Sequence, residues 1–135
     1  KTGGVSECIL EEKYVESLRQ RVLSRDLFVP RAGVRTLSSR SLHYDPVSYH
    51  NGSIWPHDTA MLAQGLRNFG YSDDAKRVET ALLKAYVHFQ TPIELYGYVR
   101  GFKLYAHANG SGACKVQAWS AASLLAVVSD PMLIE

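Results

Sequence analysis

Two amphipathic segments lie at the centre of this chain, and only two residues separate them. From Ser72 to Gln90 the apolar residues recur at the spacing of one helix face, and Pro92 ends the pattern. Pro56–Phe69 carries a second apolar face, with proline in its first turn. A connection as short as Gly70-Tyr71 places consecutive helices side by side and antiparallel. The sequence therefore predicts a helical hairpin.

Two further helices flank this hairpin in the sequence. We predict them over Glu11–Ser24 and Lys115–Ser129, and the last one has apolar residues around so much of its circumference that it should be well buried. Long loops, from about 25 to 55 and from about 91 to 114, connect the helices. If the helices alternate in direction, both loops leave from the same end of the helical layer. The predicted fold is all-α and built of antiparallel hairpins, with short strands possible near 34–38 and 95–105.

Length and composition limit the classes of protein that the chain can belong to. Its 135 residues and 15.0 kDa are typical of one domain, so we expect residues 1–135 to fold as a single unit. A formal net charge of +2, without a stripe of basic residues, argues against nucleic-acid and membrane partners. No charged and apolar leader opens the chain, so we expect a cytoplasmic protein. Cys8 and Cys114 are too few for a disulfide framework and are expected to be reduced core thiols.

The end of the first loop has the composition of a carbohydrate-binding surface. Aromatic rings stack on the C–H faces of sugars, and mixed donors and acceptors satisfy their hydroxyl groups. One alternative is structural. Asp58 would then complement the dipole of the following helix, Trp55 would fill the core, and the histidines would serve as capping groups. We favour sugar binding for the group as a whole. The candidate binding residues are His50, Asn51, Trp55, His57 and Asp58.

The second loop contains one carboxylate in an apolar setting. Glu94 lies between Ile93 and Leu95, so it is less able to face solvent than the acids at the surface of a helix. A carboxylate that a loop holds in such surroundings is a reasonable general base. The alternative is that Glu94 only accepts hydrogen bonds from backbone N–H groups and closes the loop.

Other chemistries find little support in the sequence. His50, His57 and Asp58 do not have the spacing of zinc ligands. No glycine-rich phosphate loop and no nucleophile elbow are present. We therefore expect neither a metal nor a cofactor.

Four segments, in order, resemble the C-terminal part of bacterial and archaeal glycogen-debranching-type proteins, the amylo-α-1,6-glucosidase family. The third segment, Pro92–Leu95, is similar to a Pro-Glu segment of that family and of the neutral/alkaline invertases. The last is similar to a closing Ala-Cys-x-x-Gln-Ala-Trp motif. The four segments are Gly33–Leu37, Tyr44–Asp58, Pro92–Leu95 and Ala113–Ala122.

The resemblance implies part of an (α/α)₆ toroid that acts on an oligosaccharide or α-glucan with inversion. It implies Glu94 as the general base and adds Gln117 and Trp119 to the substrate-binding residues. In that family the general acid is an aspartate that lies upstream of the first helix. This chain lacks that aspartate. We therefore expect the chain alone to have little or no activity and to associate with itself or with further toroid helices. The alternative function is that of a non-catalytic carbohydrate-binding or structural helical module.

Overall fold

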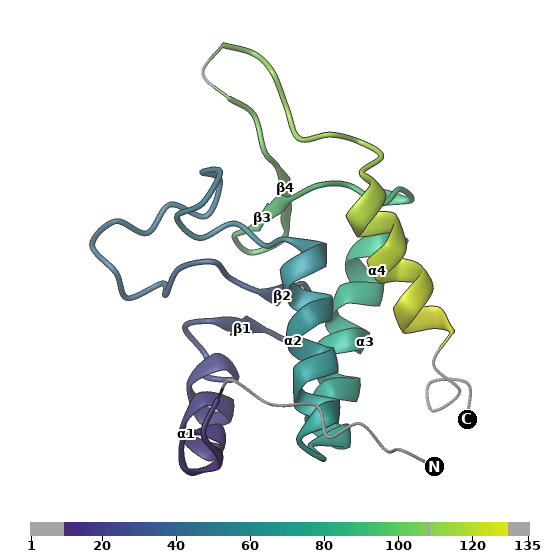
Figure 1. The fold of residues 1–135 in the computed structure, drawn as a ribbon. Helices are drawn as coiled ribbons and strands as arrows, with labels where there is room; N and C mark the ends of the chain where they lie inside the picture. Colours follow the sequence, from purple (N-terminus) through teal and green to yellow (C-terminus); the bar gives the residue numbers. More distant parts are fainter. Residues whose placement is uncertain (1–9, 108, 130–135) are drawn as a thin grey trace.

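The computed structural model describes residues 10–107 and 109–129. Helices α2, α3 and α4 lie side by side, and α1 stands apart from them (Figure 1). The described helices are α1 (Glu12–Val22), α2 (Pro56–Asn68), α3 (Ser72–Phe89) and α4 (Ala118–Val128). The described strands are β1 (Phe28–Val29), β2 (Gly33–Val34), β3 (Tyr96–Tyr98) and β4 (Phe102–Leu104).

The hairpin of α2 and α3 forms the centre of the fold. Gly70 adopts a φ of 83°, a left-handed conformation that glycine reaches without strain, and so allows the chain to reverse between the helices. Small residues at the contact let the two helices approach closely, and Phe28 from β1 packs on the same cluster. The buried members of this cluster are Phe28, Ala63, Leu66, Ala75, Val78 and Ala81.

The prediction of an all-α fold that forms part of an (α/α)₆ toroid is wrong. Helices make up about 45% of the described residues, and two small antiparallel sheets accompany them. In one sheet Phe28 pairs with Val34, and in the other Tyr96 pairs with Leu104. Segments buried against the helices must hydrogen-bond their backbone N–H and C=O groups, and antiparallel pairing does this here. Both long loops are therefore partly β-structured.

Helix α4 is less buried than its apolar composition indicated. Among its residues only Ser120, Ser123 and Val127 are buried, whereas Leu125 is 64% exposed. The reason is that α4 packs along one side only, against α2 and α3. The predicted self-association stays a prediction.

The loop between α3 and α4 is closed at its base by hydrogen bonds. Thr91 Oγ1 donates to the carbonyl of Lys115 at 2.6 Å, and the N–H of Gln117 donates to the carbonyl of Pro92 at 2.9 Å. Residues 115–117 are therefore not helical, and α4 begins three residues later than predicted. Near the far end of the loop, Ala106 pairs with Gly112.

Two further expectations can be compared with the structure. Cys114 is free but exposed, so the prediction of a core thiol is wrong for this residue, while Cys8 lies outside the described residues. Cys114 lies in the segment before α4, where its carbonyl accepts from Glu94 N–H, rather than on the face of a helix. None of the described helices has the length and apolar character needed to cross a membrane.

Candidate active site at the junction of two loops

The two long loops meet at the end of the helical layer where α2 begins and α3 ends (Figure 1). Ile54 and Tyr96 exchange two backbone hydrogen bonds, of 2.8 and 3.0 Å, which join the end of the first loop to β3. Ile54 also pairs with Arg35, and its side chain is fully buried. Close backbone contact extends to Gly97, where a Cβ atom would lie 2.4 Å from the carbonyl oxygen of Pro46. The segments that carry Trp55 and Glu94 are therefore adjacent.

Two donors hold the Glu94 carboxylate, one from each loop. Its Oε1 accepts a hydrogen bond from the Tyr49 hydroxyl at 2.6 Å, and its Oε2 accepts one from the backbone N–H of Cys114 at 2.9 Å. The backbone N–H of Glu94 donates to the carbonyl of Cys114 at 2.9 Å. The side chain is half-buried. Because a carboxylate has about four lone-pair positions, these two bonds leave room for a water molecule. The loop-closing role and the role of a base are thus compatible.

The contact with Glu94 also changes the pKa of Tyr49. The hydrogen bond to Glu94, together with burial, raises the pKa of Tyr49 from 10 to about 12, because both favour the neutral phenol over the phenolate. The raised pKa contributes stability that is fully present below pH 10 and is lost as the pH rises toward 12.

We expect the substitution Glu94→Gln to lower the pKa of Tyr49 toward its ordinary value, because an amide carries no negative charge. Ultraviolet titration of the phenolates of the wild-type and variant proteins measures this. One tyrosine should begin to ionise at lower pH in the variant, and an unchanged titration would show that Tyr49 and Glu94 do not interact.

Tyr49 lies at the centre of an aromatic cluster beside Glu94. Its ring centroid lies 4.9 Å from that of Trp55 and 5.4 Å from that of Tyr105. His50 stacks parallel to Trp55 at 5.8 Å. Trp55 itself is only 9% exposed, and its indole N–H donates to the carbonyl of Tyr49 at 3.1 Å. His50 and Tyr49 are therefore more exposed to a ligand than Trp55 is.

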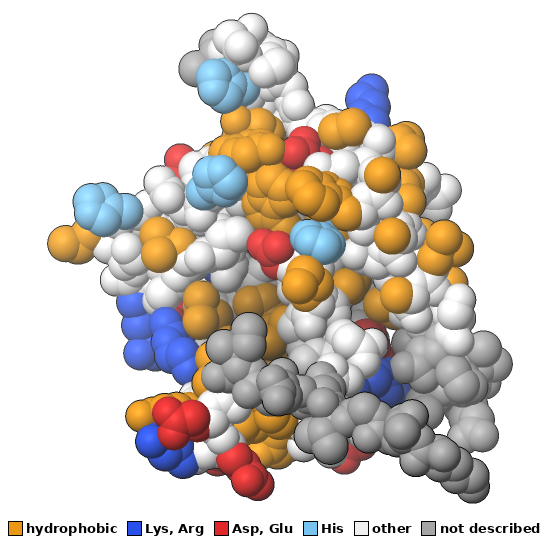
Figure 2. Space-filling view, in the orientation of Figure 1, with side chains coloured by type: hydrophobic (Ala, Val, Ile, Leu, Met, Phe, Trp, Pro, Cys, Tyr) orange, Lys and Arg blue, Asp and Glu red, His pale blue; other side chains and the backbone are white. Residues whose placement is uncertain are grey.

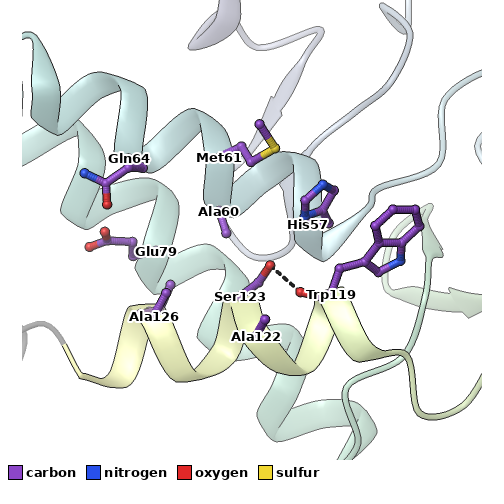
Figure 3. A pocket seen from close by; sticks show the side chains of 10 residues that line it. His57, Ala60, Met61, Gln64, Glu79, Trp119, Ala122, Ser123 and Ala126 are labelled. Atoms are coloured by element: carbon purple, nitrogen blue, oxygen red, sulfur yellow. Dashed lines mark hydrogen bonds between the residues drawn. The ribbon is translucent and has the colours of Figure 1, made fainter. Parts of the chain in front are cut away.

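His57 and Trp119 form a second group. Their rings stack at 5.0 Å, and Trp119 is 50% exposed. They lie at one end of a groove of about 290 Å³ between α2 and α4, with Ala60, Met61 and Ala122 along its walls (Figure 3). Figure 2 shows hydrophobic side chains gathered on this face of the molecule, with histidines and acids among them.

The remaining candidates differ in their surroundings. Asp58 is exposed in the first turn of α2, and within the described residues its side chain has no hydrogen-bond partner. Asn51 is exposed, and Gln117 is half-buried with its Oε1 accepting from Ser120 Oγ at 3.1 Å. In residues 10–107 and 109–129, no three His, Cys, Asp or Glu side chains gather as metal ligands would.

The structure thus brings Glu94, His50 and Trp55 into one cluster and pairs His57 with Trp119. Tyr49 and Tyr105 also belong to this cluster and are not among the site residues predicted from the sequence. Tyr49 belongs to the same run as His50 and Trp55, but its role depends on a contact across 45 residues that spacing alone does not reveal.

Residues 8–96 match a family model described as the mannosylglycerate hydrolase MGH1-like glycoside hydrolase domain. The chain belongs to this family. The match spans more than half of the chain and includes Tyr49, His50, Trp55 and Glu94. The MGH1-like chain therefore carries a domain of glycoside hydrolase type, whereas the narrower resemblance to glycogen-debranching proteins is not part of this match. No curated protein matches the sequence significantly.

Proposed function

We propose that this MGH1-like domain takes part in the hydrolysis of a glycosidic bond with inversion, and that Glu94 is the general base. The observation that supports this most is the half-buried carboxylate held by Tyr49 and by the backbone of Cys114. Such a carboxylate can take a proton from a water molecule as the water attacks the anomeric carbon. The acid that would protonate the leaving oxygen is not among the residues assigned here.

The proposed substrate is an oligosaccharide or an α-glucan, as in glycogen debranching. The name of the matched family adds mannosylglycerate as a smaller candidate. The surface of His50, Tyr49, His57 and Trp119 supports a sugar, because it combines ring faces with hydrogen-bonding groups.

A substrate that needs no general acid tests this proposal. Fluoride leaves readily without a proton from the protein, so α-glucosyl and α-mannosyl fluoride require only a base and a water molecule. We expect the chain to release fluoride from at least one of them, with the β-anomer of the sugar as the first product in proton NMR. Retention of the α-configuration, or no release above the rate in buffer, would contradict the proposal.

A second candidate function is carbohydrate binding without catalysis, which the half-exposed stack of Trp119 on His57 favours. Tryptophan fluorescence during titration with maltooligosaccharides measures such binding. We expect Trp119→Ala to weaken binding roughly 3- to 10-fold, since an aromatic stack contributes about 0.5–1.5 kcal/mol beyond buried area. Val116→Ala, at another exposed apolar residue just before α4, is the control. Equal weakening by both variants would argue against stacking on Trp119.

A further inference from the structure

A second hollow, of about 600 Å³, lies where α3 meets the turns of the two small sheets. None of the residues predicted to bind sugar lines it. Its walls come from the β1–β2 turn, from the second half of α3 and from the β3–β4 hairpin. The side chains that matter for its chemistry are Arg31, Lys84, His88, Tyr98, Arg100 and Phe102.

This hollow is cationic. Arg31, Lys84 and Arg100 come from three separate segments, and no carboxylate is among the lining residues. In the part of the chain that the structure describes, none of the three forms an ion pair; Lys84 Nζ donates to the carbonyl of Pro30 at 3.3 Å. These cations lie up to 69 positions apart in the sequence, so they form no stripe along the chain and come together only in the fold. Like charges gathered in a concave surface attract anions.

The hairpin that carries Arg100 is held in an uncommon conformation. Arg100 has a φ of 55°, and the backbone N–H of Val99 donates to the carbonyl of Gly101 at 2.9 Å. Non-glycine residues rarely adopt positive φ values, and such strain is frequent where a ligand is bound. The turn places an arginine, rather than a residue suited to that φ, at the rim of the hollow.

Aromatic rings form another wall. His88 stacks on Phe102 with ring centroids 4.5 Å apart, and Tyr98 meets Phe102 edge to face at 5.2 Å. Tyr98 and Phe102 are half-buried, so they present ring surface and are held in place. A ligand that fits both walls has an anionic group and an organic part with an apolar face.

We propose that this hollow binds the phosphate monoester of a small organic molecule, such as a sugar phosphate. A phosphate monoester carries a charge of about −1.5 to −2 at neutral pH, and arginine can bind its oxygens in a bidentate manner. The volume falls within the range of small-molecule pockets, about 300–1,000 Å³. A long polyanion such as a nucleic acid fits less well, because the exposed carboxylate of Asp73 interrupts the basic surface at the start of α3.

Proton NMR of the histidine rings in the complete chain tests the proposal. The chain has five histidines, and His88→Gln identifies the signal of His88 by its loss. Glucose 6-phosphate should shift this signal saturably, and more weakly at high salt, whereas glucose should not shift it. Inorganic phosphate should bind more weakly, since it lacks the part that contacts the rings. Equal affinity for D-glycerate or inorganic phosphate, tighter binding of single-stranded DNA, or no saturable shift would overturn the proposal.

Two variants separate this site from general attraction to a basic protein. The double substitution Lys84→Gln and Arg100→Gln should weaken binding of glucose 6-phosphate at least about tenfold, since charge-assisted hydrogen bonds are lost. Lys103→Gln, on β4 outside the lining, removes the same kind of charge and should leave affinity within about twofold. All three residues are exposed, so folding should be unaffected, which circular dichroism checks. Equal losses in both proteins would overturn the proposal. The site shares no residue with the Glu94 cluster, so a failure to hydrolyse glycosyl fluorides leaves this test unaffected.

Discussion

Replacing Glu94 by glutamine should lower the rate of glycosyl fluoride hydrolysis by about 10²- to 10⁴-fold, the usual loss when a general base is removed. An amide cannot take the proton of the attacking water. It can, however, preserve both contacts, because its oxygen can accept from Cys114 N–H and its NH₂ group can donate to the Tyr49 hydroxyl. The substitution therefore removes the base while leaving the loops joined. Initial rates of fluoride release, measured with a fluoride electrode, give the ratio directly.

The matched control for this substitution is Glu12→Gln. Glu12 is exposed in the first turn of α1, so the change removes the same charge from a surface away from the junction. We expect its rate to stay within about twofold of the wild type. If Glu94→Gln hydrolyses the fluorides at the wild-type rate, Glu94 is not the base. Added azide offers a further comparison, since an external anion can attack without a base and should partly restore turnover in the Glu94→Gln protein.

Truncation of Ile54 should strongly destabilise the protein. Its side chain is fully buried and packs with Val29, Ala85 and Tyr96, so Ile54→Ala leaves a cavity in the core. We expect a loss of about 2–5 kcal/mol in the free energy of unfolding, measured by urea denaturation.

Ile54→Val serves as the graded comparison and should cost about 0.5–1.5 kcal/mol. Because Ile54 is bonded to Tyr96 and precedes Trp55, the alanine variant should also loosen the contact between Tyr49 and Glu94. The phenolate titration of Tyr49 should then shift toward its ordinary range in Ile54→Ala and not in Ile54→Val. Equal stability of the two variants would mean that the side chain does not fill the junction.

The helices could be predicted well from the sequence because their determinants are local. Helix α2 begins at Pro56, as predicted, and α3 begins at Ser72 and ends one residue before the predicted Gln90. These boundaries follow from proline, glycine and the repeat of apolar residues, all of which act within one or two turns. The late start of α4 depends instead on hydrogen bonds to Thr91 and Pro92, which lie 24 or more residues earlier.

The loops and the site were less predictable for the same reason. Short strands are possible from the sequence near 34–38 and 95–105. β3 and β4 lie within the second range, whereas β1 lies outside both ranges and β2 meets the first only at Val34. The pairing of Phe28 with Val34 and of Ile54 with Tyr96 is tertiary. Glu94 could be predicted as a general base from its apolar neighbours and from the resemblance to glycogen-debranching-type proteins. Its partner Tyr49 could be found only from coordinates, as could the cationic hollow around Lys84, since both sites join residues from separate segments.

The closed base of the loop between α3 and α4 has a consequence for engineering. Thr91, Pro92 and Glu94 are hydrogen-bonded to residues 114–117 at the base of this loop, and Ala106 pairs with Gly112 nearer its tip. Residues 109–111 lie beyond both of these connections and are therefore held apart from Glu94. Doubling the length of a flexible loop adds only about 0.6 kcal/mol of closure entropy. Residues 109–111 are therefore a suitable place to insert a peptide tag or a fluorescent reporter without displacing Glu94.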